Sequence, residues 1–423
     1  MENLDTGLYS LRRLNLSHQL FYPSTAAAEA ATARSQAAVQ AYAESQAGYK
    51  HGLRFLNATA TSLDPLPAAS INFKPCGPSN LGDTPLDLVA LLGDESKILC
   101  ADLAGRTSLY DAEAHAVVTV PDLRSPKGRD AIPISITRAA VDGDPDQGDS
   151  IYVRSRTPDP NRIEDCFEEL RYGAGRDVFS EDQLFRGWCS LPPPPFLCNP
   201  STDELPEIDP CYDKLPADDM DPCYDDYEFP AEIDSWTVVG GSNIYISSMA
   251  SGTGTYCFDT VNWQWTHVGK WTLPFHGKAE YVPELNLWIG LSDNNPFHLC
   301  ASDLSAVDFD QPPDCLRSFR IWQISIWLPF HLDLINLGSG RFCVVKMFRS
   351  TKPRDRMVCF SDTEEDDDDE VFDCPDVINW EFAVLTGVEG VRCDGEAPLG
   401  RLKIIRHQSR YHTFKDDLIH WVL

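Results

Sequence analysis

The sequence predicts an all-β fold in which short strands recur in groups of four. From about residue 86 onwards, apolar runs of four to seven residues follow one another, and most end at glycine, proline or aspartate. Ten tryptophans and 31 prolines favour such strands and tight turns over long helices. Four strands are the content of one blade of a β-propeller, and the chain is long enough for about six four-stranded blades. Two β-sandwiches with accidental spacing are the alternative.

The clearest copy of the four-stranded unit lies between residues 236 and 274. A double glycine ends its first run, an aromatic strand ends in aspartate, and a tryptophan follows, which is close to the kelch repeat pattern. Glycines allow the tight turn, and the aromatic side chains fill the space between neighbouring blades. A kelch-like β-propeller is therefore expected. The residues expected to carry the repeat are Gly240, Gly241, Tyr256, Phe258, Asp259, Trp265 and Trp271.

The amino-terminal part of the chain differs in composition from the rest. Residues 1–24 contain a leucine-rich strand, and we expect run 11–16 to pair with run 401–406 and so close the propeller. Residues 25–50 are rich in alanine, which predicts a surface helical insertion that can bury little. Residues 51–423 form the expected propeller body.

The net charge of −30 is concentrated in two segments, which we interpret as acidic loop insertions at residues 199–234 and 362–376. The body that remains is only mildly acidic. Such a surface repels polyanions, so we expect neither nucleic acid nor membrane as a partner. The segment 199–234 also carries a short tandem repeat, the sequence Asp-Pro-Cys-Tyr-Asp at 209–213 and again at 221–225. A tolerated insertion and a twice-carried binding motif are both consistent with it.

Several runs of the sequence are similar to a grass-expanded plant family of uncharacterised proteins that carry a domain of unknown function. That family is similar to kelch-type and F-box-associated propellers. The resemblance implies a propeller and brings no activity or catalytic residue, and no F-box helices precede the propeller here. The runs that carry it are 9–17, 21–23, 191–196, 236–239, 255–260, 271–275, 277–284, 299–304, 337–343 and 382–389.

No motif for catalysis, a cofactor or a metal ion stands out. Nucleophile-elbow, zinc-helix, phosphate-loop and C-x-x-C patterns are absent, and the acidic run 142–146 departs from a calcium loop at its sixth and twelfth positions. We therefore expect no enzyme, no cofactor and no metal site. Without a recognisable signal peptide, a cytoplasmic or nuclear location is expected, not secretion.

Two oppositely charged surfaces are candidate interaction sites. One is a run of seven consecutive acids, and the other is a basic carboxy-terminal strand with an exposed face. Their residues are Glu364, Glu365, Asp366, Asp367, Asp368, Asp369 and Glu370, and Arg401, Lys403 and Arg406.

The sequence thus predicts a non-catalytic protein-interaction module whose partner is another protein. The alternatives are a small-ligand binder or enzyme that uses the central propeller channel, and weak cation binding by the acidic loops.

Overall fold

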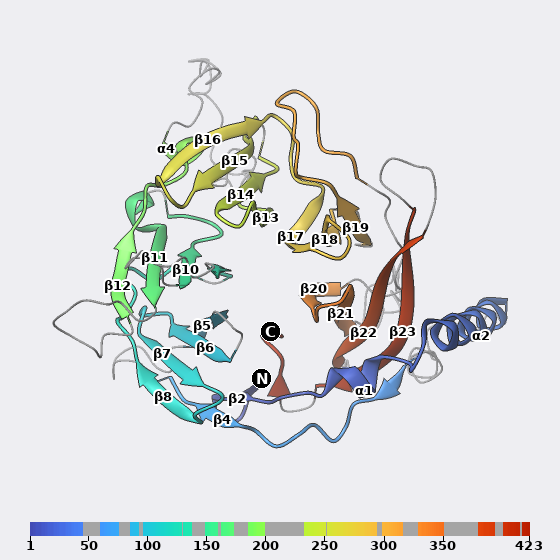
Figure 1. Cartoon of the computed structure of the whole chain (residues 1–423). Coiled ribbons are helices and arrows are strands. Elements are labelled where there is room, and N and C mark those ends of the chain that lie inside the picture. Colours follow the sequence, from blue (N-terminus) through green and yellow to red (C-terminus); the bar gives the residue numbers. More distant parts are fainter. Residues whose placement is uncertain are drawn as a thin grey trace, which may run out of the picture. The chain divides into compact units, whose positions relative to one another are not determined.

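The computed structural model divides into two compact units. Unit 1 comprises residues 1–74, 294–298 and 319–422, and unit 2 comprises residues 75–293 and 299–318 together with Leu423. In both units most of the regular structure is β-strand (Figure 1), so the expectation of a mostly β chain is confirmed. The residues that the structure describes are 1–44, 60–75, 85–92, 96–128, 130–137, 149–159, 162–172, 185–198, 232–250, 252–293, 298–315, 329–350, 380–393, 401–414 and 417–423.

Unit 2 is a series of antiparallel meanders, each formed by strands that follow one another in sequence. The first two are separate four-stranded sheets, while the third and fourth join into seven strands because β13 and β17 pair in parallel. The first meander is β5 (Leu86–Leu92), β6 (Lys97–Asp102), β7 (Thr107–Asp111) and β8 (Ala116–Thr119). The second is β9 (Ile132–Ile136), β10 (Asp149–Arg154), β11 (Phe167–Tyr172) and β12 (Phe185–Ser190), with a 3-10 turn η2 (Ile163–Asp165) before β11 and a short helix α4 (Pro195–Cys198) after β12. The third is β13 (Ser235–Val239), β14 (Asn243–Ser248), β15 (Gly254–Asp259) and β16 (Gln264–Gly269), and the fourth is β17 (Phe275–Val282), β18 (Leu287–Ser292) and β19 (Leu299–Ser302).

The short strands predicted from about residue 86 onwards and the four-stranded unit predicted between residues 236 and 274 are confirmed by the first and third meanders. Their turns use the predicted chemistry. Gly240 and Gly241 both have positive φ angles, 62° and 76°, in the turn between β13 and β14. Asp259 and Asp111 end equivalent strands, and each accepts hydrogen bonds from two backbone N–H groups of the turn that follows. The recurring aspartate is thus a turn-forming residue.

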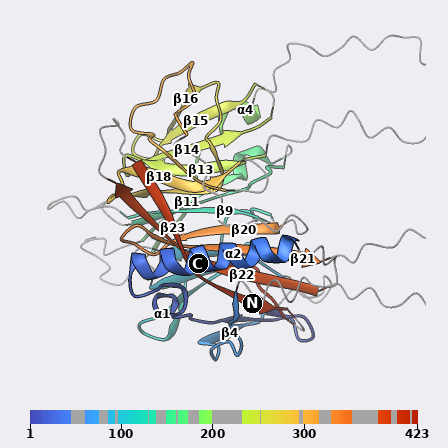
Figure 2. The ribbon, with the colours of Figure 1, turned by 90° about the vertical axis from the view of Figure 1, so that its right-hand side faces the viewer.

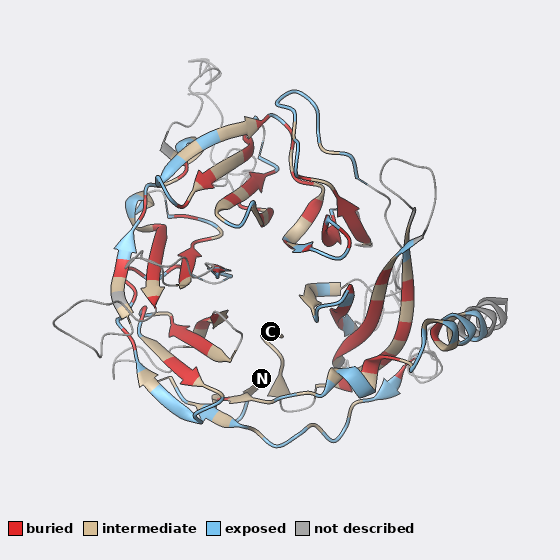
Figure 3. Cartoon of the chain, in the orientation of Figure 1, coloured by how far each residue is buried: buried red, intermediate tan, exposed pale blue. Residues whose placement is uncertain are grey.

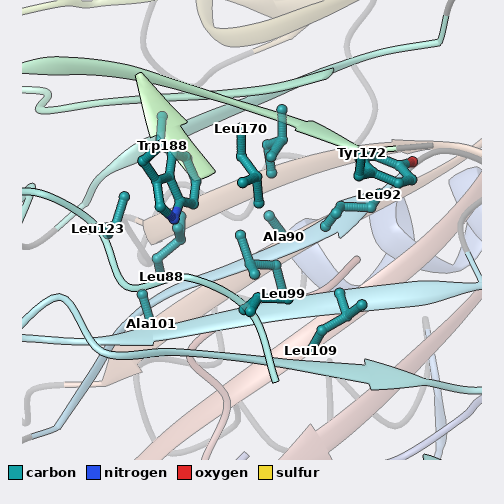
Figure 4. Packing of buried hydrophobic residues seen from close by; sticks show 13 residues of the cluster. Leu88, Ala90, Leu92, Leu99, Ala101, Leu109, Leu123, Leu170, Tyr172 and Trp188 are labelled. Atoms are coloured by element: carbon teal, nitrogen blue, oxygen red, sulfur yellow. The ribbon is translucent and has the colours of Figure 1, made fainter. Parts of the chain in front are cut away.

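Apolar clusters between neighbouring meanders form the core of unit 2. Figure 4 shows the cluster between the first and second meanders, in which Leu99 and Leu109 face Leu170 and Trp188. A second cluster joins the second and third meanders around Phe167 and Phe258, and a third joins the third and fourth. The fourth strand β8 is largely exposed and β16 is partly exposed, whereas the inner strands are more buried (Figure 3). Each sheet is therefore stabilised mainly by its neighbours.

Tryptophan side chains tie each meander to the preceding one. Trp188 of β12 donates its indole N–H to the carbonyl of Pro121, just after β8, at 2.8 Å. Trp265 of β16 donates in the same way to Pro192, just after β12, at 2.8 Å. The two bonds occupy equivalent places in consecutive meanders, and Trp288 of β18 adds a further bond to the carbonyl of Val238. These bonds satisfy the polar end of a buried ring and fix the spacing between sheets.

Unit 1 contains two sheets that combine the amino- and carboxy-terminal parts of the chain. One has the order β24-β1-β2-β4 and the other β20-β21-β22-β23-β3. The elements are β1 (Glu2–Asn3), β2 (Leu8–Leu11), α1 (Leu16–Leu20), α2 (Thr25–Glu44), β3 (Thr61–Ser62), β4 (Ile71–Phe73), β20 (Pro329–Asn336), β21 (Arg341–Ser350), β22 (Trp380–Cys393), β23 (Arg401–Thr413) and β24 (Asp417–Leu418).

The expected pairing of run 11–16 with run 401–406 is wrong. β23 pairs with β22 and, in parallel, with β3, while β2 pairs with β1 and β4. Leu16 and Leu20 instead begin and end helix α1, and the buried Leu20 packs on β22 where Gly387 leaves room for it. A Cβ atom at Gly387 would lie 2.5 Å from the carbonyl oxygen of Leu20. The two ends of the chain do pair, but through β1 and β24.

The predicted alanine-rich helix is present as α2, over the described residues 25–44, and it lies against β23 (Figures 1 and 2). Ala28 is fully buried, and the hydroxyl of Thr32 donates to the carbonyl of Arg406 at 3.1 Å. Small side chains thus let the helix approach the strand closely, although they bury little apolar area. Within the described residues, no helix combines the length and apolar character that a membrane span requires.

Candidate functional site

Three turns of unit 2 lie at the same end of the strands in the seven-stranded sheet. β13 and β17 run parallel, so the turns β13–β14, β15–β16 and β17–β18 all face the same way. We call residues 240–241, 260–263 and 281–286 the turn edge. Apolar side chains are exposed there, since Val261 is 69%, Tyr281 40% and Trp263 37% exposed. Large exposed apolar side chains on a rigid edge are typical of protein-binding surfaces.

Trp263 is held in place by its own turn and by the neighbouring meander. Its backbone N–H donates to the carbonyl of Asp259 at 2.8 Å, and its φ angle of 56° lies in the left-handed region. That region is unfavourable for a bulky residue, by about 1 kcal/mol. The guanidinium of Arg171 lies 5.5 Å from the indole centroid, and Glu169 binds Arg171 at 3.0 Å. The turn therefore fixes an exposed indole in a strained conformation beside a cation.

The carboxylate of Asp259 keeps the turn in this shape. It accepts the N–H of Val261 at 2.8 Å and the side-chain amide of Asn262 at 2.7 Å. The hydrogen bond from Asn262, followed by that from Val261, lowers the pKa of Asp259 below its ordinary value. The carboxylate therefore keeps its charge and its turn hydrogen bonds down to a lower pH than an ordinary aspartate would.

Unit 2 also buries an unusual set of charged side chains in its first two meanders. Lys127 and Glu168 form a salt bridge in which both side chains are almost completely buried. The same carboxylate accepts the backbone N–H groups of Arg124 and Ser125 at 3.0 and 3.1 Å. This network fixes the segment after β8 onto β11 of the next meander.

Arg154, at the end of β10, is 1% exposed. Its Nε donates to the carbonyl of Ser155 at 3.3 Å, and its two terminal nitrogens have no hydrogen-bond partner. Burial lowers the pKa of this guanidinium to about 10. A cation thus lies inside the sheet junction with its hydrogen-bonding capacity largely unused.

The basic strand predicted as an interaction surface is β23, and the chain's own elements contact it. Lys403 is exposed and forms a salt bridge with Glu29 of α2. Arg406 donates to the hydroxyl of Ser409 at 2.9 Å, and burial lowers its pKa to about 10. Arg401 is the first residue of the strand. Arg406 therefore does not lie on a freely exposed face as expected, because the amino-terminal helix packs beside it.

The acidic run predicted as the other interaction surface, residues 364–370, lies outside the described residues, as do residues 199–231 of the first acidic insertion. The end of that insertion leads directly into β13, where the Asp234 carboxylate accepts the N–H of Met249 at 2.5 Å.

The predicted repeat residues have structural roles in the third meander. Phe258 is fully buried in the cluster with the second meander, and Tyr256 packs on Phe196 with ring centroids 5.2 Å apart. Trp271 donates to the carbonyl of Asp308 at 2.7 Å. With Trp265 and the two glycines described above, these residues hold the sheets together and do not form a reactive site.

Sequence reasoning missed both the turn edge and the buried charges. A partial signal for the buried charges was present, since Arg154 directly follows the apolar run Ile151–Val153. Trp263 was missed because only the structure shows that it points outwards. Within the described ranges, no group of three or more His, Cys, Asp or Glu side chains is placed to hold a metal ion.

Comparison with known proteins identifies the family. Residues 1–412 match the model of a family described as "Protein of unknown function (DUF1668)". The chain belongs to the DUF1668 family. This agrees with the predicted resemblance to a family that carries a domain of unknown function. No curated protein matches this DUF1668 chain.

Solved structures similar to the DUF1668 chain include three domains. The β-propeller domain of Cps50 (Swd1) from Myceliophteria thermophila is 11% identical over 55% of this chain and 57% of that chain, with a TM-score of 0.27. The chain thus spans little more than half of that domain. The N-terminal domain of Nup159 is 11% identical over 68% and 66% of the two chains (TM-score 0.30), and the WD40 domain of SCAP from fission yeast is 9% identical over 84% and 71% (TM-score 0.29).

Proposed function

We propose that this DUF1668 protein is a non-catalytic protein-interaction module built on a kelch-like β-propeller of about six blades, acting in the cytoplasm or nucleus. The successive four-stranded meanders, with their equivalent tryptophan tethers, support the propeller. The partner is another protein. Neither nucleic acid nor membrane is proposed, because the net charge of −30 opposes binding to polyanions.

The observation that carries this proposal is Trp263, an exposed indole held in a left-handed turn next to the exposed Val261. Tryptophan is the residue most enriched among those that dominate binding energy at protein interfaces. Strain retained at an exposed position indicates that something other than stability keeps the residue there. An apolar side chain of the partner would pack on the indole, and Arg171 would offer a polar rim.

The test compares Trp263→Gly with Leu4→Ser, a change at a side chain that is 59% exposed in unit 1. Glycine relieves the left-handed strain and loses the contact with Arg171, and each effect is about 1 kcal/mol, so stability should change little. Partners recovered by affinity purification are identified by quantitative mass spectrometry and then measured with purified proteins.

We expect Trp263→Gly to weaken partner binding at least tenfold while Leu4→Ser binds normally. Equal binding by both variants would refute the turn edge as the site. Saturable stabilisation by one metabolite, followed by its turnover, would instead support the enzyme alternative.

A further inference from the structure

Arg154 points into the junction of the second and third meanders. It ends β10, where its backbone pairs with Ile132 on one side and Phe167 on the other. Its guanidinium lies 5.9 Å from the centroid of the Phe167 ring, within the cluster that also includes Ile233 and Phe258. The side chain is therefore surrounded by apolar groups and is shielded from water.

This guanidinium remains charged in the folded chain. With a pKa of about 10, roughly one molecule in a thousand is neutral at pH 7. A buried charge without a hydrogen-bonded partner is strongly unfavourable, and a guanidinium offers two parallel N–H groups suited to an oxyanion. The environment of Arg154 thus lacks the anion that such a group normally binds.

The nearby buried carboxylates are bound to other groups. Glu168 neutralises Lys127, and Glu169 accepts hydrogen bonds from Tyr152 at 2.8 Å and from Arg171 at 3.0 Å. In the part of the chain that the structure describes, no carboxylate forms a salt bridge with Arg154. The second oxygen of Glu169 is itself buried without a partner, so a water molecule that links it to Arg154 is the competing explanation.

Further hydrogen-bond donors lie on the adjoining segments. The N–H of Ile233 donates to the carbonyl of Arg156 at 3.1 Å, which joins the segment before β13 to the segment after β10. The guanidinium of Arg156 lies 5.4 Å from the Trp236 ring centroid. Arg156 Nε and Trp236 Nε1 are both buried without a partner. Burial and then the positive charge of Arg156 lower the pKa of His276, against the opposing effect of nearby carboxylates. One of these, Glu232, lies 3.5 Å from a terminal nitrogen of Arg156, so the Nε of Arg156 is its unpaired donor.

We propose that the junction between β10 and β13 binds a small oxyanion, a phosphate-type or carboxylate anion, with Arg154 as its principal donor. Arg156 Nε and the Trp236 indole are further unpaired donors on the adjoining segments. Buried N–H donors without acceptors favour an anion over a cationic ligand. This binding site is independent of the partner-binding role proposed for the turn edge.

The experiment measures thermal unfolding of the full chain in phosphate, sulfate, citrate, acetate and chloride at equal ionic strength, followed by titration calorimetry. A bound anion at a hundredfold excess over its Kd raises Tm by about 5 °C. Phosphate and sulfate test the tetrahedral class, and citrate and acetate test the carboxylates. We expect one class to stabilise saturably and chloride to have no such effect.

Arg154→Met should abolish the anion-induced shift and raise Kd at least tenfold, whereas Arg106→Met, at a partly exposed pair with Asp102, should keep both. Without anion, Arg154→Met should be no less stable than the wild type, because it removes an unpaired buried charge. If that variant fails to fold, Trp236→Phe, which removes one donor and keeps the ring, should weaken binding severalfold. No anion response beyond chloride, or an unchanged Kd in these variants, would overturn the proposal and leave the bridging water as the explanation.

Discussion

The buried pair of Lys127 and Glu168 allows a quantitative test of how the first two meanders are held together. Their side chains are 1% and 0% exposed, and Lys127 also donates to the carbonyl of Ser125 at 2.6 Å. Lys127→Met keeps most of the side-chain volume and leaves the Glu168 carboxylate with two backbone N–H donors and no counter-charge. We expect a loss of about 3–5 kcal/mol in the free energy of unfolding.

The double variant Lys127→Met/Glu168→Gln separates charge from packing. A glutamine oxygen still accepts a backbone N–H from the segment after β8, while the unpaired charge is gone. This variant should therefore lie within about 1–2 kcal/mol of the wild type. The double variant is expected to be more stable than the single one, because the single variant's loss comes mainly from an uncompensated buried charge.

Urea unfolding monitored by circular dichroism measures these differences, provided that the slope of the transition stays constant between variants. Glu168→Gln alone is the matched control, since it leaves Lys127 buried without its counter-charge and should also lose several kcal/mol. A loss below about 1 kcal/mol in Lys127→Met, or a double variant as unstable as the single one, would show that the pair is hydrated and does not stabilise the junction.

Three further predictions concern pH, packing and thiol reactivity. Burial lowers the pKa of Lys346 to about 8, so between pH 8 and 10.5 the unfolded chain holds a proton that the folded chain has released. The free energy of unfolding should thus rise with pH. From pH 7.5 to 10 it should increase by about 2 kcal/mol more in the wild type than in Lys346→Met, as measured by urea titrations. If the two proteins change equally, Lys346 is not buried as described. Gly290→Ala should lower the free energy of unfolding by about 1–3 kcal/mol in the same assay, because the Cβ of the alanine would lie 2.5 Å from the Phe275 ring. An unchanged urea midpoint would mean that the ring moves aside freely. A hydrogen bond from the Cys300 thiol lowers the pKa of the exposed Cys315 to about 7, whereas burial raises the pKa of Cys343 to about 12. Iodoacetamide at pH 7.5 should therefore alkylate Cys315 at least about 100-fold faster than Cys343, as measured by peptide mass spectrometry. Equal alkylation rates would refute this difference in pKa.

The parts of the fold that the sequence predicts are those encoded locally. The runs of the first and third meanders end at turn residues whose conformations the structure shows directly, such as Gly240 and Asp259. The alanine-rich helix follows from composition alone. Each of these features depends on neighbours within a few residues, and for that reason a single sequence is sufficient to identify it.

Features that depend on long-range contacts were not predictable in the same way. Leucines 14, 16 and 20 fit a strand or a helix equally well, and only the sheet beneath them, with Gly387 leaving room for Leu20, determines the helix. One of the two strand partners of β23 is β3, some 350 residues away, and no local signal specifies that pairing. Burial of Arg154 likewise results from packing between two meanders.

The topology of unit 1 has a consequence for the order in which the chain acquires its structure during synthesis. The strand at residues 2–3 lies between β2 and a strand at residues 417–418, so this sheet stays incomplete until the ribosome has added residue 418. Unit 2 comes almost entirely from one continuous stretch and has all of its sheet partners much earlier. Strand β1 must therefore keep one edge unpaired while unit 2 folds, which makes this amino-terminal sheet the part of the nascent chain most dependent on protection from aggregation.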